Sequence, residues 1–190
     1  NRKDIAFLES LGVRDSKMIT DEKIIKIAPI LIKNIPHTTI ILTNEKYNEM
    51  HNPKTNMNAI KAILHNKVLY NLIKNGDYKY DMVVIDQFVY KDKYYEYLSN
   101  TKEIVQNISF TTKAEDKCLS VGCSSIISRY IFLQKIDELS KELKIKIPLG
   151  AGVEVDKVGK QIVDTYNKDK LKSVAKLNFR NTEKILNKSI

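Results

Sequence analysis

Hydrophobic and polar positions follow two periods along this chain, one typical of helices and the other of strands. Apolar residues at helical spacing predict helices over residues 4–11, 20–32, 44–50, 55–75, 92–98, about 116–143 and 153–166, and one near the end of the tail at 168–190. Continuous apolar or β-branched runs predict strands over residues 38–43, 82–85 and 104–110. Because strands alternate with helices, we expect one α/β domain.

Local signals mark where several of these elements begin or break. Thr20 opens a capping-box pattern ahead of the second helix, and Thr55 is expected to cap the long helix that ends at Asn75. Pro29 lies inside the second helix, where it lacks an N–H and is expected to kink or split that helix. The run at 82–85 is apolar throughout, which is typical of a strand buried on both faces.

The composition is that of a globular protein with a sizeable core. Apolar residues make up 43% and charged residues 29% of the 190 residues, and this length favours one domain. No apolar run approaches the ~20 residues that a membrane span needs, and there is no signal-peptide pattern, so we expect no membrane association. Cys118 and Cys123 lack the spacing of a zinc site. We interpret them as buried free thiols, which fits a reducing cytoplasm.

The charge balance indicates a polyanionic partner. The net charge is +9, and basic residues are densest toward the end of the chain. By itself this excess does not say which polyanion is bound.

Two acidic positions stand out at the ends of predicted elements. Asp86 follows the apolar strand, and Glu115, next to Asp116, opens the long helix. Each has a purely structural interpretation, since Asp often starts a turn and Glu favours the positive end of a helix dipole. Together they follow strands on either side of one helical crossover, so they could meet at one edge of a sheet, where sites of α/β proteins usually lie. Carboxylates gathered there inside a basic protein point to metal-dependent phosphodiester chemistry.

Small and basic residues near these acids are candidate contacts to nucleic acid. The small residues after Glu115 are Ser120, Gly122, Cys123, Ser124 and Ser125. They permit two interpretations, close packing of the helix on the sheet or close approach of a sugar–phosphate backbone. Arg129 lies one turn beyond Ser125 and could reach a phosphate. Ser16 and Lys17 lie in a predicted loop, where Lys17 is another candidate phosphate contact.

Several long segments resemble bacterial ribonuclease HIII, a type 2 ribonuclease H, in the same order along nearly the whole chain. They are LGVRDSK at 11–17, NEKYNEMHN at 44–52, NMNAIKAILHN at 56–66, VVIDQF at 83–88, TTKAEDKCLSVGCSSIISRY at 111–130, PLGAG at 148–152 and AKLNFRNTEKI at 175–185. The resemblance implies a ribonuclease H-like mixed sheet flanked by helices. It also implies endonucleolytic cleavage of the RNA strand in an RNA–DNA hybrid duplex by a two-metal mechanism, with Mg²⁺ or Mn²⁺ and with 5′-phosphate and 3′-hydroxyl products.

The resemblance also assigns roles to particular residues. Asp86 and Glu115 match the third and fourth active-site carboxylates and are expected to be both catalytic and metal-binding. A Glu at the fourth position, where type HII enzymes have Asp, is the HIII pattern. The expected nucleic-acid-binding residues are Lys17, Ser16, Ser124, Ser125 and Arg129. We expect the protein to be a cytoplasmic monomer.

The chain departs from the family pattern at its first active-site element. The family's first two carboxylates lie in an Asp-Glu-Val-Gly-type motif on a strand that precedes LGVRDSK, and no segment here matches it. Nor does any segment match the N-terminal substrate-binding domain typical of HIII enzymes. We therefore expect residues 1–190 to form an N-terminally incomplete catalytic domain with a basic, helical C-terminal segment at about 153–190. Because two acids cannot alone hold two metals ~4 Å apart, we assign the activity to the intact protein. The alternative is a catalytically incomplete nucleic-acid-binding fragment of the same fold.

Overall fold

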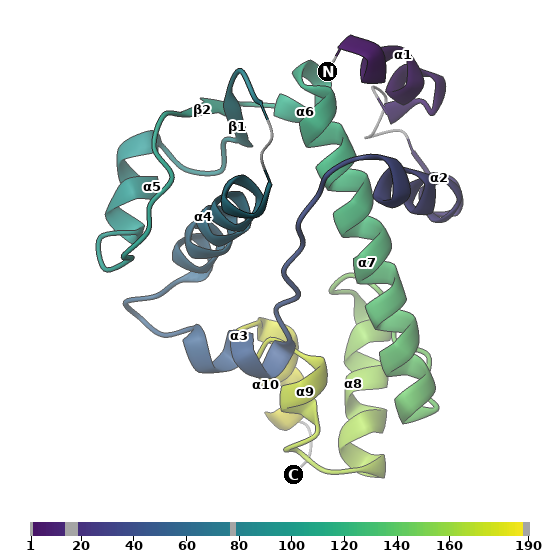
Figure 1. Cartoon of the computed structure of the whole chain (residues 1–190). Coiled ribbons are helices and arrows are strands. Elements are labelled where there is room, and N and C mark those ends of the chain that lie inside the picture. Colours follow the sequence, from purple (N-terminus) through teal and green to yellow (C-terminus); the bar gives the residue numbers. More distant parts are fainter. Residues whose placement is uncertain (1, 14–18, 77–78, 188–190) are drawn as a thin grey trace. The chain divides into compact units, whose positions relative to one another are not determined.

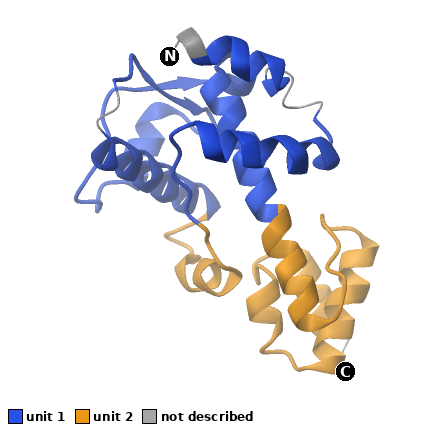
Figure 2. Ribbon diagram, turned by 45° about the vertical axis from the view of Figure 1, so that its right-hand side comes forward, with its two compact units in different colours: residues 1–40, 57–132 blue, residues 41–56, 133–190 orange. Residues whose placement is uncertain are grey.

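A computed structural model of the chain describes residues 2–13, 19–76 and 79–187. Its elements are α1 (Arg2–Ser10), α2 (Asp21–Asn34), α3 (Asn44–Met50), α4 (Met57–Asn75), β1 (Val83–Asp86), α5 (Lys91–Tyr97), β2 (Ile108–Thr111), α6 (Ala114–Lys117), α7 (Leu119–Leu143), α8 (Val153–Thr165), α9 (Leu171–Val174) and α10 (Arg180–Asn187) (Figure 1). The chain divides into two compact units, one of residues 1–40 and 57–132 and the other of residues 41–56 and 133–190 (Figure 2). The α/β class is confirmed.

The first unit contains a parallel pair of strands. β1 and β2 pair in the register that places Val83 opposite Ile108 and Asp86 opposite Thr111. Parallel strands need a long crossover, and here α5 lies in the connection between them (Figure 1). A hydrophobic cluster packs around this strand pair. Its buried residues come from α4, from α5 and the residue after it, from both strands and from the loop before β2, and are Ala62, Ile85, Tyr94, Leu98, Val105 and Ile108.

A buried asparagine fastens α4 to the loop that leads into β2. Asn66 is only 2% exposed. Its Nδ2 donates to the Glu103 carbonyl over 2.7 Å, and its Oδ1 accepts from the Val105 N–H over 2.9 Å. Both ends of the amide are thus satisfied, which a buried polar group requires. The loop enters β2 from a fixed point on α4.

A second core in the same unit joins α1, α2 and the start of α7. Leu8, Leu31 and Ile126 are among its buried residues, and Val13 is completely buried beside them. A Cβ added to Gly122 of α7 would lie 3.1 Å from the Val13 carbonyl oxygen. Gly122 therefore serves close packing, but against Val13, which follows α1, and not against the sheet, and a larger residue at 122 would force a small shift there.

The second unit contains the end of α7 together with α3, α8, α9 and α10 (Figure 2). Leu143, Ile145 and Ile162 form its buried cluster. Two amide side chains of α3 hold the segment around α9. Asn44 Nδ2 donates to the Ser173 carbonyl over 3.2 Å. Asn48 donates to the Lys172 and Ala175 carbonyls, and its Oδ1 accepts from the Leu177 N–H.

Most of the predicted helices are confirmed with small changes at their ends. Residues 44–50 form α3 as expected, and the Thr20 hydroxyl caps α2 by accepting from the Lys23 N–H. Of the two outcomes expected at Pro29, a kink or a split, the split is wrong, because α2 runs continuously from Asp21 to Asn34 with Ala28 and Leu31 buried on either side of the proline. The predicted cap at Thr55 is also wrong. α4 begins at Met57, and the N–H of Thr55 instead donates to the Asn52 side chain in a preceding turn.

The predicted helix at about 116–143 is divided in two. α6 ends at Lys117, Cys118 has an extended backbone, and α7 begins at Leu119. Neither Pro nor Gly marks this break in the sequence, so no local signal predicts it. The tail holds two short helices, α9 and α10, where one was expected. The α3 amides described above fasten the segment around the first of these.

The strand predictions are less accurate. Residues 38–43 have no regular secondary structure, so the strand predicted there is wrong. β-branched residues favour an extended backbone, but a strand also needs a partner, and in the described part of the chain β1 and β2 pair only with each other. β2 begins at Ile108 instead of Ile104. The expectation that the run at 82–85 is buried on both faces is wrong, since only Ile85 of β1 is fully buried.

Among the described residues, no helix combines the length and the apolar character that crossing a bilayer would require.

Candidate functional site

Asp86 ends β1 at the edge where both strands finish. It lies opposite Thr111, the last residue of β2, and the Gln87 N–H extends the pairing by donating to the Thr111 carbonyl over 3.0 Å. The Asp86 side chain is exposed, and its Oδ1 accepts a hydrogen bond of 2.9 Å from the Ala114 N–H. Contacts to the described residues thus hold one carboxylate oxygen and leave Oδ2 for a ligand.

Glu115 follows immediately after this hydrogen bond. The chain leaves β2, turns at Lys113 and enters α6 at Ala114, which is completely buried. Glu115 occupies the first turn of α6 and is half-buried. It lines a depression of about 260 Å³ together with Asp116, Lys117, Cys118 and Leu119. The fold therefore brings the two predicted carboxylate positions to one edge of the sheet, and the Ala114 N–H ties one to the segment that carries the other.

Two side chains of α4, Lys61 and His65, lie against Phe88, two residues after Asp86, and His65 is near enough to Asp86 to feel its charge. The sequence analysis did not single them out for this site. The His65 ring lies 5.2 Å from the Phe88 ring, and Lys61 Nζ lies 5.6 Å from the same ring. Although part of His65 is exposed, loss of solvation lowers its pKa, Lys61 lowers it further, and the Asp86 carboxylate opposes both effects. The helical spacing of Lys61 and His65 was the available signal, because residues four apart share a helix face.

The small residues at the start of α7 divide into a buried set and an exposed set. Gly122 and Cys123 are buried, and burial raises the pKa of the Cys123 thiol to about 11, as expected for an inert free cysteine. Ser120, Ser124 and Ser125 are exposed, and the Ser124 hydroxyl donates to the Ser120 carbonyl over 2.9 Å. The serine side of the helix is the one that a backbone phosphate could approach.

Arg129 already has protein partners. Its Nε and Nη2 donate to the two carboxylate oxygens of Asp21 over 2.9 and 2.8 Å, and its guanidinium lies 5.3 Å from the Phe132 ring. These hydrogen bonds lower the pKa of Asp21. The predicted role of Arg129 in phosphate binding stays a prediction, with Asp21 as a competitor. Ser16 and Lys17 lie outside the described residues.

The chemistry of the donor groups is that of a site for a hard divalent cation. Carboxylate oxygens are the ligands that Mg²⁺ and Mn²⁺ prefer. In the described ranges, however, no three His, Cys, Asp or Glu side chains gather closely enough to hold a metal ion. Asp86 and Glu115 therefore fit as part of a ligand set.

The chain belongs to the ribonuclease HII family, because the family model described as Ribonuclease HII matches residues 1–182. The resemblance to ribonuclease HIII is also confirmed. The chain is 41% identical over 186 residues to ribonuclease HIII of Bacillus cereus, which covers 97% of this chain and 60% of that protein. It is 43% identical over 185 residues to ribonuclease HIII of Streptococcus agalactiae, covering 96% and 62%.

Solved structures agree. The crystal structure of Bst-RNase HIII in complex with Mn²⁺ is 35% identical with a TM-score of 0.96, and the match covers 100% of this chain and 62% of that one. Ribonuclease H2 from Pyrococcus horikoshii, at 20% identity and a TM-score of 0.72, shares the fold. This chain thus spans about three fifths of the length of the curated relatives that it matches.

Proposed function

We propose that this chain is the part of a ribonuclease HIII that carries Asp86 and Glu115, and that the whole protein cuts the RNA strand of RNA–DNA hybrids. The observation that supports this most directly is the junction of β1, β2 and α6, where the Ala114 N–H binds Asp86 one residue before Glu115. Membership of the ribonuclease HII family supports a role for this junction in hydrolysing RNA. Cleavage leaves a 5′-phosphate and a 3′-hydroxyl.

Asp86 and Glu115 act in this proposal as ligands of Mg²⁺ or Mn²⁺. When bound there, two divalent cations would supply an activated water and would stabilise the leaving oxygen. The residues of this chain supply rigidity. Asp86 ends a paired strand, and a backbone N–H fixes one of its carboxylate oxygens. The side chain therefore keeps one rotamer, and its other oxygen is already oriented toward a ligand. A relative, Bst-RNase HIII, has been crystallised with Mn²⁺.

Substrate binding in this proposal relies on shape and charge. Hybrid duplexes are recognised through their geometry, their phosphates and the RNA 2′-hydroxyl, so sequence-specific base contacts are not needed. The net charge of +9 favours a polyanion. We assign phosphate or sugar contacts to Ser16, Lys17, Ser124, Ser125 and Arg129. A monomeric state and a cytoplasmic location remain predictions.

The decisive experiment replaces each carboxylate in the whole encoded protein. We expect Asp86→Asn and Glu115→Gln each to abolish cleavage of a hybrid in Mg²⁺ or Mn²⁺, while circular dichroism and the unfolding midpoint stay as in the wild type. Asp81→Asn is the matched control, because Asp81 is an exposed aspartate that lies before β1. Full activity in either active-site variant would contradict the assignment.

A second candidate function is binding of nucleic acid without cleavage. The described residues hold two of the expected carboxylates in this region and no cluster of three metal ligands. In that case the whole protein binds the hybrid with a strong salt dependence and cuts it in neither metal.

A further inference from the structure

Lys113 adopts a backbone conformation that is unusual for its residue type. Its φ of 52° and ψ of 48° place it in the left-handed region, directly before α6. For an L-residue with a Cβ this conformation costs free energy relative to the right-handed one, and Gly or Asn is the usual occupant. Its persistence here indicates that the surrounding structure holds it in place.

The left-handed residue lies between the two strands' shared edge and Glu115. Thr111 is paired with Asp86 at the end of β2, and the chain must then reverse sharply to enter α6. The reversal points the Ala114 N–H at Asp86 Oδ1, 2.9 Å away. It also sends the Ala114 side chain into the interior, where it is completely buried. Without this reversal of the chain, the Ala114 N–H would not point at the Asp86 carboxylate.

Further hydrogen bonds close the same turn on its other side. The Asp116 N–H donates to the Lys113 carbonyl over 3.2 Å, and the Cys118 N–H donates to the Ala114 carbonyl over 2.8 Å. Lys117 Nζ donates to the Thr112 carbonyl over 2.9 Å. Glu115 therefore lies between the turn that is hydrogen-bonded to Asp86 and the hydrogen bonds that close α6.

The side chain of Lys113 contributes less to this arrangement than its backbone does. It is exposed to solvent. The hydrogen bonds that define the turn use the carbonyl of Lys113 and the groups of its neighbours. If Lys113 acted only through its charge, its backbone would not need the left-handed conformation.

We propose that left-handed Lys113 is a positioning residue, which sets Glu115 relative to Asp86 by aiming the Ala114 N–H at the Asp86 carboxylate. The inference rests on the proposed function, in which these two acids share divalent cations. It predicts that backbone conformation at position 113, and not the lysine charge, controls the affinity of the site for Mn²⁺.

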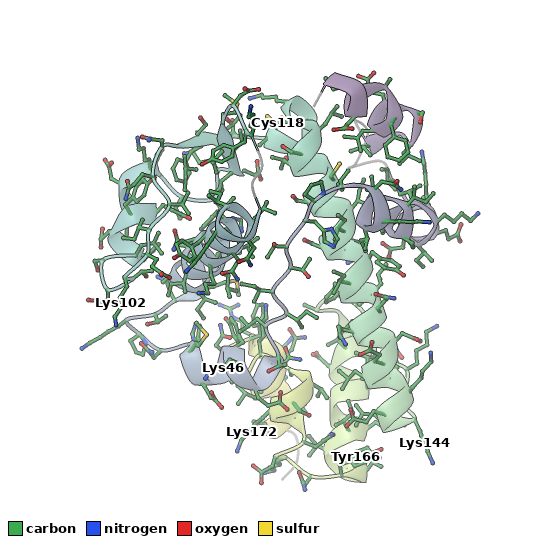
Figure 3. All side chains as sticks on the ribbon, viewed as in Figure 1. Lys46, Lys102, Cys118, Lys144, Tyr166 and Lys172 are labelled. Atoms are coloured by element: carbon green, nitrogen blue, oxygen red, sulfur yellow. The ribbon has the colours of Figure 1, made fainter. Side chains whose placement is uncertain are left out.

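Three substitutions in the whole encoded protein separate backbone from charge. Lys113→Gly removes the charge and accepts the left-handed region freely, and Lys113→Gln removes the charge while keeping an unbranched side chain. Lys113→Val introduces a β-branched residue, for which the left-handed region is a genuine outlier. Lys144 is the matched control position, since it is a second lysine with a φ of 52°, just after the end of α7 (Figure 3).

Two readouts do not depend on catalysis. The first is the hydrogen-exchange rate of the Ala114 amide, which reports its bond to Asp86. We expect it to be within about threefold of wild type in Lys113→Gly and Lys113→Gln, and at least about tenfold faster in Lys113→Val. The second is the Mn²⁺ dissociation constant from calorimetry, expected to rise by about tenfold or more in Lys113→Val alone, because the competent conformation is less populated. Lys144→Val should leave both quantities unchanged, although it too introduces a strained residue.

Several outcomes would overturn the inference. One is a tenfold weaker Mn²⁺ affinity in Lys113→Gly, which would make the lysine side chain the important group. Another is wild-type exchange and affinity in folded Lys113→Val. Should Lys113→Val fail to fold, a weakened Mn²⁺ affinity in the glycine or glutamine variant still contradicts the inference, because both remove only the lysine side chain. If the wild type cuts no hybrid in either metal, the proposed function fails. The Ala114 exchange rates of the Lys113 variants do not depend on cleavage, so they test the positioning role by themselves.

Discussion

Arg129 shows how one side chain can be shared between the fold and a substrate. It binds both oxygens of Asp21, and the two side chains keep 39% and 43% of their surface exposed. Ion pairs this exposed contribute little to stability, so a phosphate can compete for the guanidinium. Since Arg129 lowers the pKa of Asp21, the stabilisation is present above the ordinary value of 3.8 and is lost as the pH falls through the lowered value.

This competition leads to a prediction for hybrid binding measured without divalent cations, so that no strand is cut. Arg129→Ala should weaken binding by roughly three- to tenfold and reduce the log–log salt slope by up to about 0.9, the share of one phosphate. Asp21→Asn should strengthen binding, because it releases the guanidinium. Asp137→Asn serves as the control, since Asp137 also pairs with a basic residue, Lys141, on an exposed helix face. An unchanged salt slope in Arg129→Ala would show that Arg129 belongs to the fold alone.

At the scale of elements, the packing of α8 against α10 depends on one glycine. A Cβ added to Gly159 would collide with the Cδ1 atom of Ile185. Ile185 is buried, and Gly159 is buried within α8. A flexible side-chain end is the nearest obstacle, so a smaller residue at 185 should remove the conflict.

We therefore expect two substitutions to compensate each other. Gly159→Ala alone should lower the free energy of unfolding by about 1–2 kcal/mol, because overpacking outweighs the gain of ~1 kcal/mol in helix propensity. Adding Ile185→Val removes the colliding methyl group and should restore most of this loss, giving a favourable coupling of about 1 kcal/mol in a double-mutant cycle from urea unfolding. Gly152→Ala, where the added Cβ meets open space, should show no coupling to position 185. Additive losses at 159 and 185 would refute the packing argument.

At the scale of the whole molecule, the number of carboxylates decides what these residues can do alone. In the proposed function Asp86 and Glu115 are two of the metal ligands, no cluster of three possible ligands occurs among the described residues, and the relatives that match are longer than this chain. We expect a protein of residues 1–190 alone to bind a hybrid without cutting it. The protein as encoded, with any residues before Asn1, should cut it in Mg²⁺ or Mn²⁺.

Electrophoresis of a labelled hybrid and the mass of the intact sample test this together. Cleavage by a preparation whose mass is near 21.9 kDa would require the site to be rebuilt from residues 1–190 alone. An encoded protein that binds and never cuts would instead favour the binding function.

Much of the candidate site could be predicted because its chemistry is local. Asp86 after an apolar run and Glu115 after a strand are visible in the sequence, and the structure brings their segments together. The break at Cys118 and the paired state of Arg129 could not be predicted. No helix-breaking residue marks Cys118, and the partner of Arg129 lies 108 residues away along the chain.

The sequence alone determined the α/β class and the position of α3 at residues 44–50, and it singled out Asp86 and Glu115 as candidates. These features follow from side-chain chemistry and from periodicity over a few neighbouring residues. Only the tertiary structure decided that residues 38–43 are not a strand, and that Lys113 adopts a left-handed turn. A strand requires a partner distant in sequence, and a lysine carries no local preference for the left-handed region. The left-handed turn at Lys113 links parts of the chain that are distant in sequence, because it leads from the paired strand ends to the Ala114 N–H that donates to Asp86.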